Sequence, residues 1–204
     1  MKVLIVDYGM GNLASVARAI EVAGGRAMIS LSPMDIKKAS HIVLPGVGAF
    51  PDAMHALHHG GWVESLIEAF NVQCIPALGI CLGMQLLADY GEEHGITPGL
   101  GIIGGRVCQM VPQAGERLPH VGWNEVIQVK QSELFARTEP SADYYFVHKY
   151  HFNAANQESI LATSNYAGGF VSAIQREHVF GVQFHPEKSS KNGLQLIRNF
   201  LAMG

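Results

Sequence analysis

The spacing of apolar and polar positions changes about half-way along the chain. In the first half, short continuous apolar runs alternate with segments whose apolar residues recur every three or four positions. The runs predict buried parallel strands, and the periodic segments predict helices that cover the sheet. The predicted strands are residues 2–7, 26–30, 41–44 and 76–80. Helices are predicted to begin near Leu13, Ser32, Pro51 and Trp62, and another is predicted directly after the fourth strand.

From about Leu100 the pattern becomes one of short strands separated by glycines and turns, which is typical of antiparallel pairing. These strands are predicted at residues 106–111, 125–129, 144–148, 159–163, 169–174 and 179–183, and a helix over 192–202 closes the chain. The sequence therefore predicts an α/β fold. It has a mostly parallel, flavodoxin-like central sheet flanked by helices and an antiparallel, β-rich C-terminal half. No linker interrupts it, so we expect a single domain over residues 1–204.

Composition narrows the classes of protein. The chain has 204 residues, of which 48% are hydrophobic and 15% charged, as in a folded globular protein. A net charge of −3 gives no electrostatic reason to expect nucleic acid or an anionic membrane as a partner. No apolar run is long enough for a membrane span. Three cysteines without Cys-x-x-Cys spacing argue against a disulfide framework or structural zinc, so we expect a cytoplasmic protein with Cys74 and Cys108 packed inside.

The segment Gly79-Ile80-Cys81-Leu82-Gly83 carries the strongest chemical signal. A strand that turns sharply into a helix needs small residues on both sides of the turn, and the turn residue is then presented at the sheet edge. Here that residue is a thiol, and a helix N-terminus favours its thiolate form. The simpler interpretation is a buried core cysteine, but the flanking glycines favour a nucleophile.

A base for that nucleophile is encoded about a hundred positions later, in His185-Pro186-Glu187. Residues two apart in an extended stretch point the same way, and Pro186 prevents a helix. Glu187 can therefore reach the imidazole of His185, which can exchange a proton with Cys81. Alone this tripeptide is a weak signal, but with the cysteine it completes a Cys-His-acid triad.

These two motifs resemble those of the class I (triad) glutamine amidotransferases, and more specifically the glutaminase subunits of imidazole glycerol phosphate synthases. Further matching segments are residues 7–13, 44–50, 119–124, 145–148 and 181–189, so the resemblance covers nearly the whole chain. It implies hydrolysis of the glutamine side-chain amide. Cys81 would attack the amide carbon, His185 would protonate the departing ammonia, and Glu187 would orient the imidazole.

The resemblance also assigns roles to the other matching positions. The backbone N–H of Leu82, at the start of the helix, suits one oxyanion donor, and the resemblance places the second in Gly46-Val47-Gly48, so that Val47, Gly48 and Leu82 form the oxyanion hole. The glutamine-binding positions are Gly46, Gln85, His148, Lys149 and Tyr150, the last three on one strand. Lys149 departs from the family pattern, in which a small hydroxyl residue is usual. The positions facing a partner and the ammonia exit are Asn12, Trp123 (expected in a loop), Tyr145 and Lys188.

The partner implied by the resemblance is a separate (β/α)₈-barrel cyclase subunit, forming a heterodimer with this chain. It would use the ammonia to make imidazole glycerol phosphate and an aminoimidazole carboxamide nucleotide in histidine biosynthesis. Because free ammonia would be wasted, we expect the lone chain to idle until the partner sets the peptide at Val47.

Three alternatives remain open on the sequence. The nearest is a paralogous glutaminase that feeds another acceptor, such as a bacterial surface sugar. The others are an inactive interaction subunit and a redox protein, which the complete triad argues against. We expect no cofactor, because Gly9-Met10-Gly11 lacks the acidic residue of a dinucleotide site. We expect no metal, because His55 and His59 have no acidic partner nearby.

Overall fold

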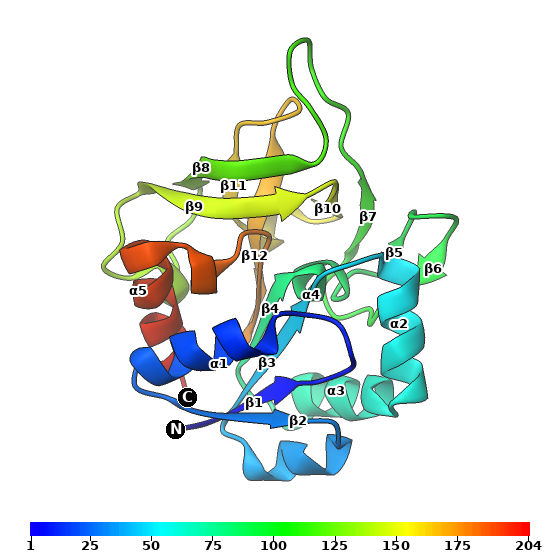
Figure 1. Ribbon diagram of the computed structural model, residues 1–204, viewed down its shortest axis with the longest axis vertical. Helices are drawn as coiled ribbons and strands as arrows, with labels where there is room; N and C mark the ends of the chain where they lie inside the picture. Colours follow the sequence, from blue (N-terminus) through cyan, green and yellow to red (C-terminus); the bar gives the residue numbers. More distant parts are fainter.

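A parallel sheet forms the centre of the molecule in the computed structural model, which describes residues 1–204 (Figure 1). Its order is β2-β1-β3-β4-β13, and these five strands are parallel to one another. Their bounds are β1 (Lys2–Val6), β2 (Arg26–Ser30), β3 (His41–Gly46), β4 (Ala77–Cys81) and β13 (Val179–Val182). The predicted parallel sheet is therefore present, with one strand contributed by the far end of the chain.

Two apolar cores lie on the two faces of this sheet. Alternate residues of β1 enter different cores: Leu4 and Val6 belong to one, and Val3 and Ile5 to the other. The helices divide accordingly, with α2 (Phe50–His59) and α3 (Trp62–Asn71) on the first face, and α1 (Leu13–Val22) and α5 (Ser190–Leu201) on the second. Burial on both faces explains the continuous apolar runs in the sequence. The helices are all too short or too polar to span a lipid bilayer.

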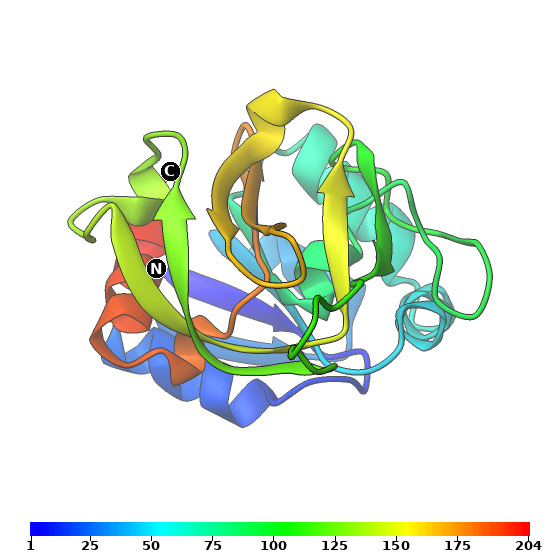
Figure 2. The same cartoon turned by 90° about the horizontal axis from the view of Figure 1, so that it is seen from above.

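The C-terminal half extends the same sheet, which has 13 strands in all, as a curved wall (Figure 2). Most of its strands pair antiparallel with their neighbours. The short β5 is parallel to β7. The strand β13 joins the two halves, since it is antiparallel to β12 and parallel to β4. The predicted α/β fold with an antiparallel, β-rich half is confirmed. The remaining strands are β5 (Tyr90–Gly91), β6 (Thr97–Pro98), β7 (Gly105–Gln109), β8 (His120–Gln128), β9 (Ser141–His148), β10 (Tyr150–Ala154), β11 (Ile160–Ser164) and β12 (Phe170–Arg176). Four 3₁₀ helices connect elements: η1 (Pro33–Lys38), η2 (Glu133–Phe135), η3 (Gln157–Ser159) and η4 (Pro186–Lys188).

Several local predictions were wrong. The single strand expected through His148, Lys149 and Tyr150 is broken by a bend at Lys149, and β10, which starts at Tyr150, was not predicted. Trp123 lies within β8 and not in a loop, because its neighbours continue the ladder to β9. Cys74 is exposed and Cys108 is only half-buried, so neither is a core residue.

The chain turns sharply at Cys81, but the helix after the turn is much shorter than the sequence predicted. The helix α4 is one turn (Leu82–Gln85), and irregular turns follow it. Two glycines make the turn possible. A Cβ on Gly83 would collide with the carbonyl oxygen of Leu44, and one on Gly79 would lie 2.6 Å from the carbonyl oxygen of Gly83. The predicted elbow is present, but the short helix provides little of the dipole expected from a long one.

Replacing Gly83 by alanine is expected to lower the free energy of unfolding by about 1–3 kcal/mol, because a methyl group must displace the β3 backbone. Urea-induced unfolding followed by circular dichroism measures this. Gly104→Ala is the matched control, since its Cβ would meet only atoms at 3.8 Å and beyond, and it is expected to change stability by less than about 0.5 kcal/mol. Equal effects of the two substitutions would contradict the steric explanation.

Candidate active site

Cys81 ends β4 with a positive φ of 54° and a ψ of −109°, a backbone conformation that is rare for a residue other than glycine. Its side chain is 5% exposed. The sulfur lies 3.6 Å from Nε2 of Gln183 and 3.8 Å from the carbonyl oxygen of Val147. Non-glycine residues in strained backbone conformations cluster at functional sites, so the turn marks Cys81 as more than a packing residue.

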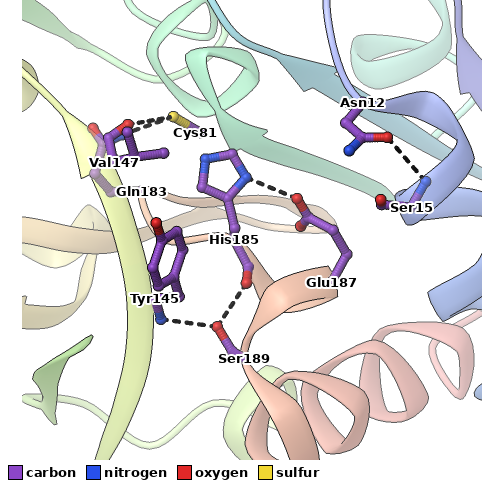
Figure 3. A network of polar contacts seen from close by, with 9 residues as sticks. All are labelled: Asn12, Ser15, Cys81, Tyr145, Val147, Gln183, His185, Glu187 and Ser189. Carbon is purple, nitrogen blue, oxygen red and sulfur yellow. Dashed lines mark hydrogen bonds and ion pairs between the residues drawn. The ribbon is translucent and has the colours of Figure 1, made fainter. Parts of the chain in front are cut away.

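His185 lies between Cys81 and Glu187 (Figure 3). Its Nδ1 is 2.8 Å from Oε1 of Glu187, and the two side chains are only 3% and 2% exposed. Nδ1 is therefore committed to the carboxylate, and Nε2 is buried without any hydrogen-bond partner. The structure brings the three predicted triad residues together, with a free imidazole nitrogen available on the side of the thiol.

The charge state of His185 is set by its two neighbours. Burial alone would lower its pKa, but Cys81 and Glu187 outweigh burial and raise the pKa to about 10. The imidazole is thus protonated when the sulfur is a thiolate. Such an ion pair holds both a nucleophile and a proton for a leaving group in one site.

A cavity of about 290 Å³ opens beside the Cys81 sulfur. Its walls come from the loop after β3, the elbow, the β5–β6 connection and the bend between β9 and β10. The lining residues are Val47, Gly48, Cys81, Leu82, Gln85, Glu93, Val147, His148, Lys149 and Tyr150. Every residue predicted to bind glutamine or to form the oxyanion hole lines this cavity except Gly46, which precedes Val47 and pairs with Cys81 in the sheet.

The loop after β3 has free backbone donors beside the sulfur. Neither the N–H of Val47 nor that of Gly48 donates a hydrogen bond within the chain. Gly48 has a φ of 122°, which favours glycine, and a Cβ there would lie 2.5 Å from Cε of Met10. The preceding carbonyl, that of Pro45, accepts a hydrogen bond of 2.7 Å from the buried Tyr8 hydroxyl. The loop is therefore anchored at Pro45, while the N–H groups of Val47 and Gly48 remain available.

Gln85 is 5% exposed and faces the cavity. Its Nε2 donates to the carbonyl oxygen of Tyr150 at 3.0 Å and to Oε1 of Gln183 at 2.9 Å. Both amide protons are used, so its carbonyl oxygen is the atom left for a ligand. The sequence did not single out Gln183, although it lies within the 181–189 segment.

Glu93 is a second residue that the sequence did not reveal. It lies on the β5–β6 connection, lines the cavity and accepts a 2.7 Å hydrogen bond from the N–H of Phe50 at the start of α2. The carboxylate therefore caps α2, which follows the loop of Val47 and Gly48, and adds negative charge to the cavity. An acidic residue in a polar loop carries no local signal for this position, because the fold alone brings it to the site.

Two buried histidines form a chain that ends at the cavity. Nδ1 of His148 lies 2.8 Å from the carbonyl oxygen of Tyr150, and Nε2 lies 3.0 Å from Nδ1 of His120. Nε2 of His120 lies 3.3 Å from Nδ2 of Asn124. A carbonyl only accepts, so protons on both Nδ1 atoms satisfy every contact. Burial lowers the pKa of His148 to about 3, and the nearby His120 adds to the effect. Burial also lowers the pKa of His120, so both imidazoles are neutral at physiological pH.

Three of the four residues predicted to face a partner form one surface patch. Trp123 is 54% exposed and meets the Tyr145 ring edge-on at 6.2 Å, and Nζ of Lys188 lies 5.8 Å from the centre of the Tyr145 ring. Asn12 is exposed at the start of α1, which packs against η4, and its side chain caps that helix through the N–H of Ser15. Asn12 therefore has a structural role that the sequence did not indicate.

Ser189 connects Tyr145 of this patch to the backbone of His185 through hydrogen bonds (Figure 3). Its hydroxyl donates to the carbonyl oxygen of His185 at 2.6 Å and accepts from the N–H of Tyr145 at 3.0 Å. The N–H of His185 donates in turn to the carbonyl oxygen of Tyr145 at 2.8 Å. The position of His185 thus depends on β9 as well as on its own turn.

The chain belongs to the family described as glutamine amidotransferase class-I, which it matches over residues 4–203. It is 42% identical to imidazole glycerol phosphate synthase subunit HisH 1 of Campylobacter jejuni, over 98% of this chain and 100% of that one. It is 45% identical to subunit HisH of Desulfitobacterium hafniense, over 96% and 92% of the two chains. The family resemblance predicted from the motifs is confirmed.

A solved structure with the same fold is that of PurLQS from Thermotoga maritima. The TM-score is 0.76 at 17% identity, covering 98% of this chain and 97% of that one. At this identity the similarity supports the fold alone.

Acidification is expected to destabilise the protein through His148. Its pKa is about 3 in the folded chain and about 6.5 when unfolded. The unfolded state therefore binds the extra proton between these values, and stability falls as pH decreases from 6.5, by at most about 1.4 kcal/mol per pH unit from this residue. His185 does not oppose this, since its raised pKa affects stability only above pH 6.5. Unfolding free energies at pH 6.5, 5.75 and 5 test the slope. His148→Asn should make the slope less steep but not flat, because burial also lowers the pKa of His41, His120 and His151. An unchanged slope would contradict the assignment.

Proposed function

We propose that this chain hydrolyses glutamine to glutamate and ammonia with Cys81, His185 and Glu187 as its triad. The observation that carries the proposal is the buried Nε2 of His185, which has no partner and lies on the thiol side of an imidazole fixed by Glu187. The open cavity beside the sulfur supports it, because a substrate amide can enter there. Membership of the amidotransferase family supports the same chemistry.

In the first half of the reaction, the Cys81 thiolate adds to the amide carbon of glutamine. The tetrahedral intermediate collapses as Nε2 of His185 gives its proton to the leaving nitrogen, which departs as ammonia and leaves a thioester. In the second half, His185 takes a proton from water, and the hydroxide attacks the thioester. Glutamate then leaves, and the thiolate is restored.

The oxyanion of each tetrahedral intermediate needs hydrogen-bond donors. The N–H groups of Val47 and Gly48 have no partners within the chain and line the cavity, and Leu82 begins α4, where N–H groups lack helical partners. Loss of one such donor typically lowers the rate about 10²- to 10³-fold. Rotation of the peptide at Val47 would therefore be enough to switch the enzyme between idle and active states.

The cavity also suits the zwitterionic head of glutamine. Glu93 and Lys149 both line it and carry opposite charges, and Nζ of Lys149 lies 5.8 Å from the centre of the Tyr150 ring. We assign the substrate ammonium to Glu93 and the carboxylate to the Lys149 region. The Oε1 of Gln85 is free to accept a hydrogen bond from the same ligand. In this arrangement Lys149, the residue that departs from the family pattern, adds to glutamine binding.

The acceptor of the ammonia is proposed to be a separate (β/α)₈-barrel cyclase that forms a heterodimer with this chain in histidine biosynthesis. The names of the HisH relatives describe them as subunits of imidazole glycerol phosphate synthase, which supports a partner of that synthase. The exposed patch of Trp123, Tyr145 and Lys188 suits the docking surface. It is close to the proposed triad, because Lys188 directly follows Glu187 in η4.

Cys81→Ala is expected to abolish glutamine hydrolysis by the mixture of this chain and the cyclase, because no nucleophile remains. Glutamate release measures the activity. Cys74→Ala is the matched control, because that thiol is exposed and outside the cavity, and it should retain full activity. Adding ammonium salt to the cyclase should replace this chain altogether. Retained hydrolysis in the Cys81 variant would refute the nucleophile.

Trp123→Ala is expected to weaken binding of the cyclase about tenfold or more, since large exposed aromatic residues dominate interfaces. Titration calorimetry measures the affinity, and the partner-dependent rise in glutaminase rate should need correspondingly more cyclase. Val72→Ala removes another exposed apolar side chain, far along the sequence after α3, and should leave the affinity unchanged. The docking surface would be wrongly placed if Trp123→Ala bound normally.

A further inference from the structure

Gln183 is the one fully buried amide in contact with the nucleophilic sulfur. It follows β13 directly, is 0% exposed, and is held by its own N–H, which donates to the carbonyl oxygen of Ser172 at 2.9 Å. Its Nε2 donates to Sγ of Cys81 at 3.6 Å, and its Oε1 accepts from Nε2 of Gln85 at 2.9 Å. One side chain thus touches both the reacting atom and a wall of the glutamine cavity.

The backbone carbonyl of Tyr150 fixes the direction of these hydrogen bonds. The carbonyl of Tyr150 is a backbone group and can only accept, so it requires the NH₂ group of Gln85 on its side. The same NH₂ group then requires the oxygen of Gln183, and the NH₂ group of Gln183 must face the sulfur. Reversing Gln85 would set its oxygen against two other oxygens, and reversing Gln183 would set its NH₂ group against that of Gln85. Either arrangement is strongly unfavourable in a buried site.

We propose that Gln183 stabilises the Cys81 thiolate by donating a hydrogen bond to it, and that it positions Gln85 so that Oε1 of Gln85 faces the substrate. Hydrogen bonds to charged groups are about twice as strong as neutral ones, so this donor favours the reactive form of the sulfur. The second role is indirect, and in it Gln183 is a positioning residue. The inference rests on the proposed glutaminase function only for its effect on glutamine.

Two substitutions separate the roles. Gln183→Glu, assayed at pH 8 so that the carboxylate is ionised, can still accept from Gln85 but cannot donate to the sulfur. Gln183→Met has a similar length and can do neither. The matched control is Gln128→Met, because Gln128 is also partly buried and uses both amide protons, at Thr138 and Glu139, away from the cavity.

The first measurement is the rate at which iodoacetamide alkylates Cys81 in the full-length chain, followed by mass spectrometry of its peptide. Both Gln183 variants should react about tenfold or more slowly than the unsubstituted chain, as expected for loss of one hydrogen bond to a charged group. Cys74, exposed in the same molecule, is the internal standard and should react at an unchanged rate, as should Cys81 in the Gln128 variant. Alkylation of Cys81 at the normal rate in folded Gln183→Glu would overturn the proposal.

The second measurement is steady-state glutamine hydrolysis with the cyclase present. Gln183→Glu should lower kcat about tenfold and leave KM within about twofold, whereas Gln183→Met should also raise KM, because Gln85 loses its orientation. Equal KM values for the two variants would overturn the positioning role. If the unsubstituted chain hydrolysed no glutamine, the proposed function would fail, while the alkylation rates would still decide the role of Gln183 at the sulfur.

Discussion

The parallel pairing of β4 with β3 on one side and β13 on the other is the constraint on which the site depends. Its register sets Gly46 opposite Cys81, and Val182 opposite Ile80. The carboxyl ends of the three strands therefore meet at one edge, where ligands bind in open parallel sheets. Segments about 35 and 100 positions from the cysteine supply the loop donors and the imidazole without any flexible linker between them.

Close packing fixes the remaining geometry. The elbow passes so near β3 that no side chain fits at Gly83, and the Tyr8 hydroxyl holds the carbonyl of Pro45, just before the loop of Val47 and Gly48. Behind the cavity, the carbonyl of Tyr150 accepts from both His148 and Gln85. A backbone group cannot reverse its polarity, so this acceptor orders the side chains on either side of it. The site is consequently rigid around the sulfur, while the peptide at Val47 keeps unpaired donors.

Local signals in the sequence were enough for the parallel half of the fold and for the expectation that Cys81, His185 and Glu187 lie at one site, where the structure brings them together. Continuous apolar runs, helical spacing and glycines beside Cys81 each act over a few residues. What the sequence did not reveal depends on distant segments meeting. Gln183 and Ser189 read as ordinary polar residues after a strand, and Glu93 as part of a polar loop. The break at Lys149 has no strong local signal, since Val147, Tyr150 and Phe152 around it all favour strands. Cys74 is exposed because it lies in the connection after α3.

The short turn η4 links the interior to the surface. Glu187 points to the buried imidazole, and the adjacent Lys188 is exposed and lies over the Tyr145 ring. Some surface positions can therefore change during the evolution of a new docking specificity more easily than others. Changes around position 188 would disturb the position of His185, whereas the outward side of β8, which bears Val121 and Trp123, can vary without moving that imidazole. Divergence among paralogues that keep the same chemistry but serve other synthases should accordingly concentrate on that strand.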